Sequence, residues 1–285
     1  FYGLQGSRLL DNWIWQNRAG IDGGAVAESG GLLMRGNRVR ENEAINGGAV
    51  ASSDGLFEQN YFEGNRATAG GAFWRVSGEV RSSLIVANSA RRGAAFDAFH
   101  GIIQNNTITR NFGPLDHADQ PTTDSLGAAL FMEGAGVLMR ANIFEHNGGI
   151  TLMSASAETT RTDRLTLEGN LFHEPDHAVL SLGVGTRVFA SVGELEAGYE
   201  HARGNLAGDP LFVAPLGPDG ELFGFDDNDF RLAAGSPAIG RGSPLVMTVM
   251  PAWDLDGFAR LTDLAADLGA WQFESRIDSD GDGLD

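Results

Sequence analysis

The chain has 285 residues, 42 % of them apolar, and a formal net charge of −18. This length and composition allow a substantial core and exclude a disordered chain. The negative charge argues against nucleic-acid and anionic-membrane partners, because phosphate recognition needs a basic surface. The sequence contains no cysteine and no lysine, which excludes disulfides, thiolate catalysis and Schiff-base chemistry. No apolar stretch approaches about 18 residues, so we expect no transmembrane segment.

The chain begins Phe1-Tyr2 without methionine and enters a repeated pattern by Asn12. This start is typical of a mature or excised portion of a longer protein. An uncovered first repeat would expose unpaired strand edges. We therefore expect end-to-end contact there, either with another subunit or with a missing N-terminal domain.

One short unit recurs between residues 37 and 111. Its closing asparagines are spaced by 23 residues, at Asn42, Asn65, Asn88 and Asn111. An apolar residue stands three positions before each of them, at Val39, Phe62, Ile85 and Ile108. Glycine–alanine signals separate the units, reading GGAV from residue 47, GGAF from residue 70 and GAAF from residue 93. The pattern extends upstream to residue 12 and downstream to residue 147, so a stacked repeat is indicated.

A unit of 23 residues holds three short strands joined by tight corners, since a strand residue advances about 3.3 Å. Each coil, meaning one full turn of the repeat, would bury its apolar column against its neighbours. Asparagines and glycines suit the corners. The signatures of leucine-rich repeats and of calcium-binding nonapeptide repeats are both missing. We predict an all-β fold, a single-stranded right-handed parallel β-helix with coils of about 23 residues.

The alternation of GGA with Phe-x-x-Asn, as at 62–65 and 144–147, resembles the repeat of bacterial parallel β-helix proteins of the pectate-lyase-like superfamily. It is also similar to the repeat of the polymorphic outer membrane proteins. A later stretch resembles the segment that closes the helix in large secreted bacterial β-helix proteins. It contains Gly208–Val213, Asp229–Leu232, Gly235–Ile239, Asp254–Gly257, Arg260 and Leu268–Trp271. The resemblance implies the fold and a secreted bacterial origin. It does not imply one activity, because lyases, glycosidases, adhesins and proteins of no known activity share this fold.

We divide the chain into a parallel β-helix over residues 1–204, a capping segment over 205–274 and the start of an acidic repeat or linker over 275–285. Prolines at positions 210, 215, 218, 237, 244 and 251 disfavour long regular strands in the second part. We expect this part to be irregular, to cover the last coil and to be structural.

The first coils carry aromatic and basic residues on the expected outer face, at Trp13, Trp15, Arg38, Arg40 and Tyr61. Sugar rings stack on flat aromatics and arginine binds carboxylates through two bonds, so this column could bind an acidic polysaccharide. Exposed aromatics and cross-strand charge pairs such as Arg40 with Glu63 also simply stabilise sheets. The two columns that flank the core column are mixed in character, so we expect them to face solvent. They read Arg38, Tyr61, Leu84, Thr107 and Arg40, Glu63, Val86, Thr109.

The longest break in the repeat, residues 113–125, contains Asp116, His117, Asp119 and Asp124. Inserted loops often carry function, and neighbouring coils can add Arg91, Arg92, Asp97, His100 and Glu133. An arginine base with acidic calcium ligands would suit a lyase, and paired carboxylates would suit a glycosidase. No spacing establishes either geometry, so we assign no catalytic residue. The histidines His146, His173, His177 and His201 lack metal-ligand spacing.

The chain ends in an acidic pattern with carboxylates at Asp278, Asp280, Asp282 and Asp285. The first three alternate as in the first half of a calcium loop, with glycine at the sixth position. The pattern resembles the start of a thrombospondin type 3 calcium repeat. This resemblance implies calcium as a cofactor and supports an extracellular or cell-surface location, where free calcium is high.

Three functions remain open. We favour a secreted or cell-surface module that acts as a non-catalytic scaffold or adhesin and binds polysaccharide. The alternatives are a polysaccharide lyase or glycoside hydrolase, and a self-assembling extracellular fibre subunit.

Overall fold

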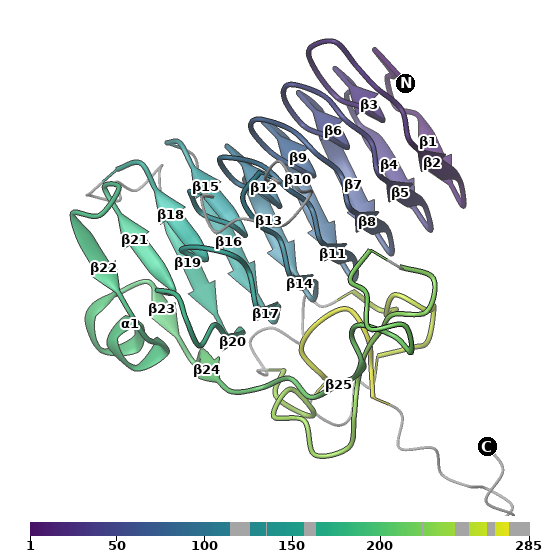
Figure 1. Ribbon diagram of the computed structural model, residues 1–285. Helices are drawn as coiled ribbons and strands as arrows, with labels where there is room; N and C mark the ends of the chain where they lie inside the picture. Colours follow the sequence, from purple (N-terminus) through teal and green to yellow (C-terminus); the bar gives the residue numbers. More distant parts are fainter. Residues whose placement is uncertain are drawn as a thin grey trace, which may run out of the picture.

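The computed structural model describes residues 1–114, 126–134, 136–156, 164–223, 225–242, 251–260 and 266–273. Most of this length winds into a parallel β-solenoid, whose coils stack from the N-terminus toward helix α1 (Val192–Gly198) (Figure 1). The strands of successive coils form three long parallel sheets. The predicted all-β parallel β-helix is therefore confirmed.

Each sheet has eight strands. Sheet 1 contains β1 (Arg8–Leu10), β4 (Leu32–Arg35), β7 (Asp54–Glu58), β10 (Ser77–Arg81), β13 (His100–Gln104), β16 (Val137–Arg140), β19 (Leu165–Glu168) and β23 (Ala202–Arg203). Sheet 2 contains β2 (Trp13–Trp15), β5 (Arg38–Arg40), β8 (Tyr61–Glu63), β11 (Leu84–Val86), β14 (Thr107–Thr109), β17 (Ile143–Glu145), β20 (Leu171–His173) and β24 (Leu206–Ala207). Sheet 3 contains β3 (Val26–Ala27), β6 (Val50–Ala51), β9 (Phe73–Trp74), β12 (Phe96–Asp97), β15 (Leu130–Met132), β18 (Leu152–Ser154), β21 (Leu180–Leu182) and β22 (Arg187–Phe189).

Side chains that point inward form one continuous core along the solenoid. The predicted apolar column lies in register on sheet 2, where Val39 pairs with Phe62 and Phe62 with Ile85. On sheet 3 the rings of Phe73 and Phe96 stack with their centroids 4.9 Å apart. Both rings are fully buried. Each coil therefore depends on its neighbours for its apolar burial, as expected for a repeat of this kind.

Two ladders of buried asparagines stabilise the corners on either side of sheet 2. In one ladder Asn65 donates through its backbone N and its Nδ2 to Oδ1 of Asn88, at 2.9 and 3.0 Å. Asn88 repeats this pattern with Asn111. The asparagines that the repeat places at corners thus stack coil upon coil, with a period of 23 residues in the regular coils. The period grows to 36 residues across the insertion that precedes β15.

The glycine–alanine corners need glycine for two different reasons. Gly47 has a φ of +61°, a conformation that disfavours residues with a Cβ. Gly48 approaches the next coil so closely that a Cβ would lie 2.3 Å from the carbonyl oxygen of Gly71. The first glycine of this corner therefore supplies a positive φ, and the second permits the close approach of the next coil.

The last coil is covered by elements that the sequence repeat did not predict. Strand β22 pairs antiparallel with β21 and ends the parallel stacking of sheet 3. Helix α1 follows, with the hydroxyl of Ser191 accepting from the backbone N of Glu194 as an N-cap. Val192 and Leu195 of α1 join the solenoid core. The end of the solenoid is thus closed by residues 187–199.

The C-terminal segment, meaning the described residues between 208 and 273, lies along the flank of the solenoid (Figure 1). It packs on the outer face of sheet 2, and Gln59 Nε2 donates to the carbonyl of Asp254 at 2.6 Å. Our expectation that this part covers the last coil was wrong. The expectation that the outer columns of sheet 2 face solvent was also wrong for the middle coils, where Leu84 and Val86 are buried. These apolar outward positions exclude water by binding the C-terminal segment.

The sequence motifs of the C-terminal segment form hydrogen bonds that stabilise its conformation. The only regular element described in it is the antiparallel pair β25 (Phe212–Ala214) and β26 (Asp229–Leu232). The buried guanidinium of Arg260 donates to the carbonyls of Gly269 and Ala270, at 2.8 and 2.9 Å. Asp254 accepts from the backbone N of Gln272 at 3.0 Å. These bonds give Arg260 and Asp254 a structural role.

Candidate functional site

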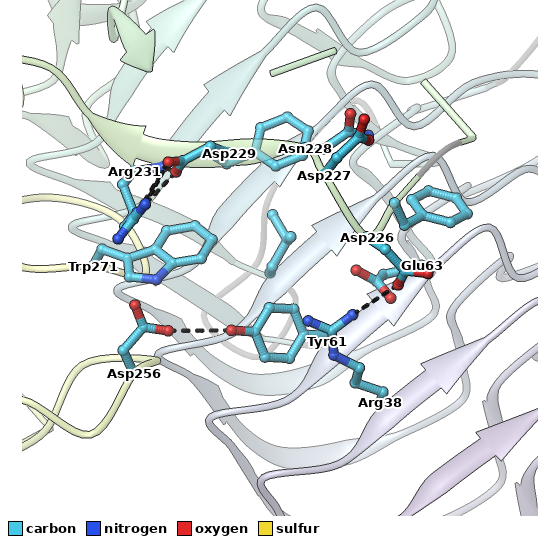
Figure 2. Close-up of a pocket in the computed structure, with 13 residues that line it drawn as sticks. Arg38, Tyr61, Glu63, Asp226, Asp227, Asn228, Asp229, Arg231, Asp256 and Trp271 are labelled. Carbon is cyan, nitrogen blue, oxygen red and sulfur yellow. Dashed lines mark hydrogen bonds and ion pairs between the residues drawn. The ribbon is translucent and has the colours of Figure 1, made fainter. Parts of the chain in front are cut away.

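A pocket of about 290 Å³ lies between the outer face of sheet 2 and the C-terminal segment (Figure 2). The solenoid contributes the side chains at its base and the C-terminal segment contributes the opposite side. The lining residues are Arg38, Tyr61, Glu63, Leu84, Phe225, Asp226, Asp227, Asn228, Asp229, Phe230, Arg231, Asp256 and Trp271. Neither part of the chain forms this pocket alone.

The base of the pocket continues a column of outward side chains on sheet 2. Trp13, Arg38 and Tyr61 are in register on β2, β5 and β8. The guanidinium of Arg38 lies 5.3 Å from the Trp13 ring and 4.6 Å from the Tyr61 ring. Such cation–π contacts hold both the ring and the cation in place. The column therefore leads from the exposed first coil into the pocket.

The opposite side of the pocket is an acidic stretch that binds the arginines of sheet 2. Asp226 forms ion pairs with Arg38 at 3.4 Å and with Arg40 at 3.0 Å. The guanidinium of Arg40 also lies 4.7 Å from the ring of Phe225. Both arginines that we expected to bind carboxylates of a polysaccharide thus have a carboxylate of the protein as their partner.

The far side of the pocket is closed by Asp256 and Arg231. The hydroxyl of Tyr61 donates to Asp256 at 3.2 Å, and burial together with the charge of Asp256 raises the pKa of Tyr61. Arg231 pairs with Asp229 through two bonds, Nε to Oδ1 at 2.9 Å and Nη2 to Oδ2 at 2.6 Å. Figure 2 shows Asp256 and Tyr61 at one side of the pocket and Arg231 with Asp229 above them.

Glu63 is the most unusual group in the pocket because it is a nearly buried acid, 2 % exposed, on an outer face. Burial raises its pKa to about 7, against the opposing effects of Arg38 and Arg40. Its Oε2 is buried and has no hydrogen-bond partner. The Oδ1 of Asn228 and the Nε1 of Trp271 are also buried without a partner. Unsatisfied buried polar atoms are uncommon in native proteins and indicate a missing ligand, ion or water.

The raised pKa of Glu63 predicts a stability effect that depends on pH. The folded pKa is about 7 and the ordinary value is 4.5, so the favourable contribution of the protonated acid is complete below pH 4.5 and is lost as the pH rises through 7. Glu63→Gln, which is neutral at every pH, should therefore be more stable than the wild type at pH 8, by on the order of 3 kcal/mol. At pH 4.5 the two proteins should have similar melting temperatures. The exposed Glu43→Gln serves as control, and an equal difference at both pH values would contradict the account.

The structure places the predicted polysaccharide-binding residues in one region of sheet 2, but some of them are exposed and others line the pocket. Trp13 and Trp15 are 63 and 56 % exposed at the end of the column. Arg38 and Tyr61 line the pocket, and Arg40 lies beside it against Phe225. Arg40 and Glu63 are neighbours in register, yet the ion pairs of Arg40 are with Asp226 and Glu41. Polysaccharide binding by these residues stays a prediction.

The insertion candidates lie partly outside the described residues. This applies to Asp116, His117, Asp119 and Asp124. The structure does bring three of their proposed neighbours together beside sheet 3, since Arg92 pairs with Asp97 of β12 at 3.0 Å and with Glu133 at 2.6 Å. Burial raises the pKa of Asp97 to about 6. Arg91 and His100 are exposed elsewhere on the coil.

Metal binding is not supported within the described ranges. No group of three or more histidine, cysteine, aspartate or glutamate side chains there is arranged to hold a metal ion. His146 and His173 do approach each other, with ring centroids 5.1 Å apart. The predicted calcium ligands Asp278, Asp280, Asp282 and Asp285 lie outside the part of the chain that the structure describes. Calcium binding there stays a prediction.

Most of the residues that line the pocket were not predicted from the sequence. The stretch Phe225–Phe230 contains three aspartates and an asparagine between two aromatic residues, a signal that the repeat analysis passed over. Asp256 and Trp271 belong to motifs that we interpreted as structural. None of these residues carries the repeat period, so nothing in their spacing connects them with Arg38 and Tyr61.

No described helix has the length and apolar character needed to cross a membrane. Comparison with protein-family models gives one match, to the right handed beta helix region, over residues 25–189. Searches of the curated proteins and of the solved structures give no significant match. The match covers most of the solenoid and stops before the C-terminal segment, so the wall formed by residues 225–231 lies outside it. Because the matched residues are more than half of the chain, the protein belongs to the family of right-handed β-helix proteins.

Proposed function

We propose that this β-helix is a secreted or cell-surface module that binds a polysaccharide in the pocket between sheet 2 and the C-terminal segment. The observation that carries the proposal is a set of three buried polar atoms without partners in a pocket lined by aromatic rings. They are Oε2 of Glu63, Oδ1 of Asn228 and Nε1 of Trp271. A ligand that forms hydrogen bonds with all three atoms must have both donors and acceptors.

Saccharides match this lining better than apolar ligands do. Small-molecule sites combine apolar walls with a few placed polar groups, and the rings of Tyr61, Phe230 and Trp271 supply flat apolar surface here. Hydroxyl groups on a sugar ring donate and accept hydrogen bonds, so they can satisfy both the carboxylate and the indole nitrogen. Pocket space of about 290 Å³ suits one or two sugar units rather than a long chain segment.

The column beyond the pocket supports a chain ligand. Trp13 and Trp15 are exposed on the same face as Tyr61, and both lie two coils away from it. Exposed aromatics at the end of a polar column offer additional stacking surfaces for sugar units that extend from the pocket. The solenoid keeps these positions at a fixed spacing, because its coils stack in register. In this account the β-helix is a rigid scaffold or adhesin, and the acidic C-terminal repeat adds calcium binding in an extracellular setting.

A titration with oligosaccharides tests the proposal. Tyr61→Leu keeps apolar bulk but removes the aromatic face and the bond to Asp256, so we expect about tenfold weaker binding, or about 1.4 kcal/mol. Tyr2→Leu, a matched change at an exposed tyrosine, should leave binding unchanged. Calorimetry on a panel of neutral, amino and uronic-acid oligosaccharides provides the measurement. Absence of binding to every member, or equal effects of the two variants, would contradict the proposal.

Hydrolysis of the bound glycan is a second candidate, favoured by one observation. Glu63 has a pKa raised to about 7, as a general acid requires, and the carboxylate of Asp226 lies close enough to contribute to this shift. Carboxyl groups in different environments are typical of glycosidases. Release of reducing ends by the wild type and its loss in Glu63→Gln would establish hydrolysis, whereas binding without release leaves the scaffold function.

A further inference from the structure

The charge of the pocket is strongly asymmetric. Five of its thirteen lining residues are carboxylic acids, and two are arginines. Each arginine has an acidic partner from the pocket itself, Asp226 for Arg38 and Asp229 for Arg231. Three acids remain, Glu63, Asp227 and Asp256, and no ion pair to them is found among the described residues. The pocket therefore has excess negative charge close to an aromatic surface.

The positions of the unsatisfied atoms agree with this charge. Two of the three are acceptors, Oε2 of Glu63 and Oδ1 of Asn228, and both are buried. A buried carboxylate oxygen without a donor is costly, because it has lost its water and gained no partner. The indole nitrogen of Trp271 is the single unsatisfied donor in the pocket lining described here. A matching ligand presents several donors, a positive charge and at least one acceptor.

We infer that the pocket selects a saccharide unit with a free, protonated amino group over neutral N-acetylated and uronic-acid units. This inference rests on the proposed saccharide-binding function and names its ligand class. An ammonium group has three donors and no acceptor, so it satisfies Glu63 and Asn228 while it offsets the excess negative charge. A neighbouring hydroxyl oxygen accepts from Trp271. A uronate would place a further carboxylate among the five already present, which is unfavourable.

The protonation of Glu63 is coupled to such a ligand. The groups that act on this carboxyl are Arg38, Arg40, Asp226 and Glu41, and burial has the largest effect. A bound ammonium would favour the ionised carboxylate and lower its pKa from about 7. Binding should therefore release protons near neutral pH, which calorimetry in buffers of different ionisation enthalpy detects. An N-acetylated ligand carries no such charge and should release none.

The test compares three oligosaccharides of equal length with the full chain, at about pH 6.5 and moderate salt. They are a glucosamine oligomer, its fully N-acetylated form and a galacturonate oligomer. We expect the glucosamine oligomer to bind at least about tenfold more tightly than the N-acetylated form, with no measurable binding of the uronate. Glu63→Gln should weaken glucosamine binding by about tenfold and weaken N-acetylated binding less, because it removes the charge but keeps a side-chain oxygen that can accept from a sugar hydroxyl.

Non-specific attraction to an acidic protein is the main competing explanation. Glu43→Gln removes the same charge from an exposed position on another part of the coil. Equal weakening by Glu43→Gln and Glu63→Gln would overturn the inference. Tighter binding of the N-acetylated or uronate oligomer in the pocket would also overturn it, although the proposed function would then stand. If no oligomer binds, both the inference and the proposed function fail.

Discussion

Phe96→Ala is expected to lower the free energy of unfolding by about 3–5 kcal/mol. The Phe96 ring is fully buried, stacks on Phe73 at 4.9 Å and meets Phe99 edge-on at 5.4 Å. Its removal leaves a cavity in the middle of the solenoid, and neighbouring coils cannot collapse into it, because their backbones are held in register. Urea-induced unfolding followed by circular dichroism measures the loss.

The matched control for this change is Phe258→Ala, the same chemical change at a position that is 51 % exposed. We expect an effect within about 0.5 kcal/mol there. A loss smaller than about 1 kcal/mol for Phe96→Ala would contradict the continuous core described above.

Asn88→Leu should lower the free energy of unfolding by about 3 kcal/mol or more. Leucine is close to asparagine in shape but cannot form hydrogen bonds. The backbone N and Nδ2 of Asn65 would lose their acceptor, and the carbonyl of Phe62 would lose the donor that approaches it at 2.9 Å. Each buried polar group left without a partner costs about 1–3 kcal/mol. Thermal and urea unfolding measure the effect.

Asn17→Leu is the control within the same ladder. Asn17 is exposed and donates to Asn42, but no earlier coil bonds to it. We expect a loss below about 1 kcal/mol for this variant. If Asn17→Leu and Asn88→Leu lower the free energy of unfolding by the same amount, the asparagine ladder does not stabilise the corners cooperatively.

The sequence predicted the solenoid well because its physical constraints repeat. Every regular coil needs an asparagine that can bond the next one, as in the pair Asn65 and Asn88. It also needs a glycine that tolerates the close approach of the next backbone, as at Gly48. A constraint that recurs every 23 residues is visible in a single sequence, and it establishes strand order, register and the inward column together.

The C-terminal segment could not be placed in this way. Its contacts are non-periodic and distant, since Gln59 and Asp254 are 195 residues apart in the sequence. The outer columns of sheet 2 held a signal, because their outward residues change from Trp13 and Arg38 to Leu84 and Ile143. Over four coils each column contains both polar and apolar residues, so we expected the columns to face solvent. Only the change from polar to apolar residues along the solenoid shows where the C-terminal segment covers the flank.

The site was predictable on one side only. Trp13, Arg38 and Tyr61 could be assigned to one outward column from the repeat, and the structure places them in register. Their partners Asp226 and Asp256 come from the non-repeating segment, so their pairing depends on tertiary structure. The buried state of Glu63 depends on that same segment, and an acid on an outer strand gives no sign of it in the sequence.

A crystal structure of the protein with its tightest-binding oligosaccharide tests the central claim most directly. The account predicts a sugar unit between Tyr61 and Trp271, with a donor on Oε2 of Glu63, an acceptor for Nε1 of Trp271 and further units toward Trp13. A saccharide bound at another face, such as beside Arg92 and Asp97 on sheet 3, would contradict the account. The account would also be contradicted if the oligosaccharide were absent from the pocket and ordered water alone bonded to Glu63, Asn228 and Trp271.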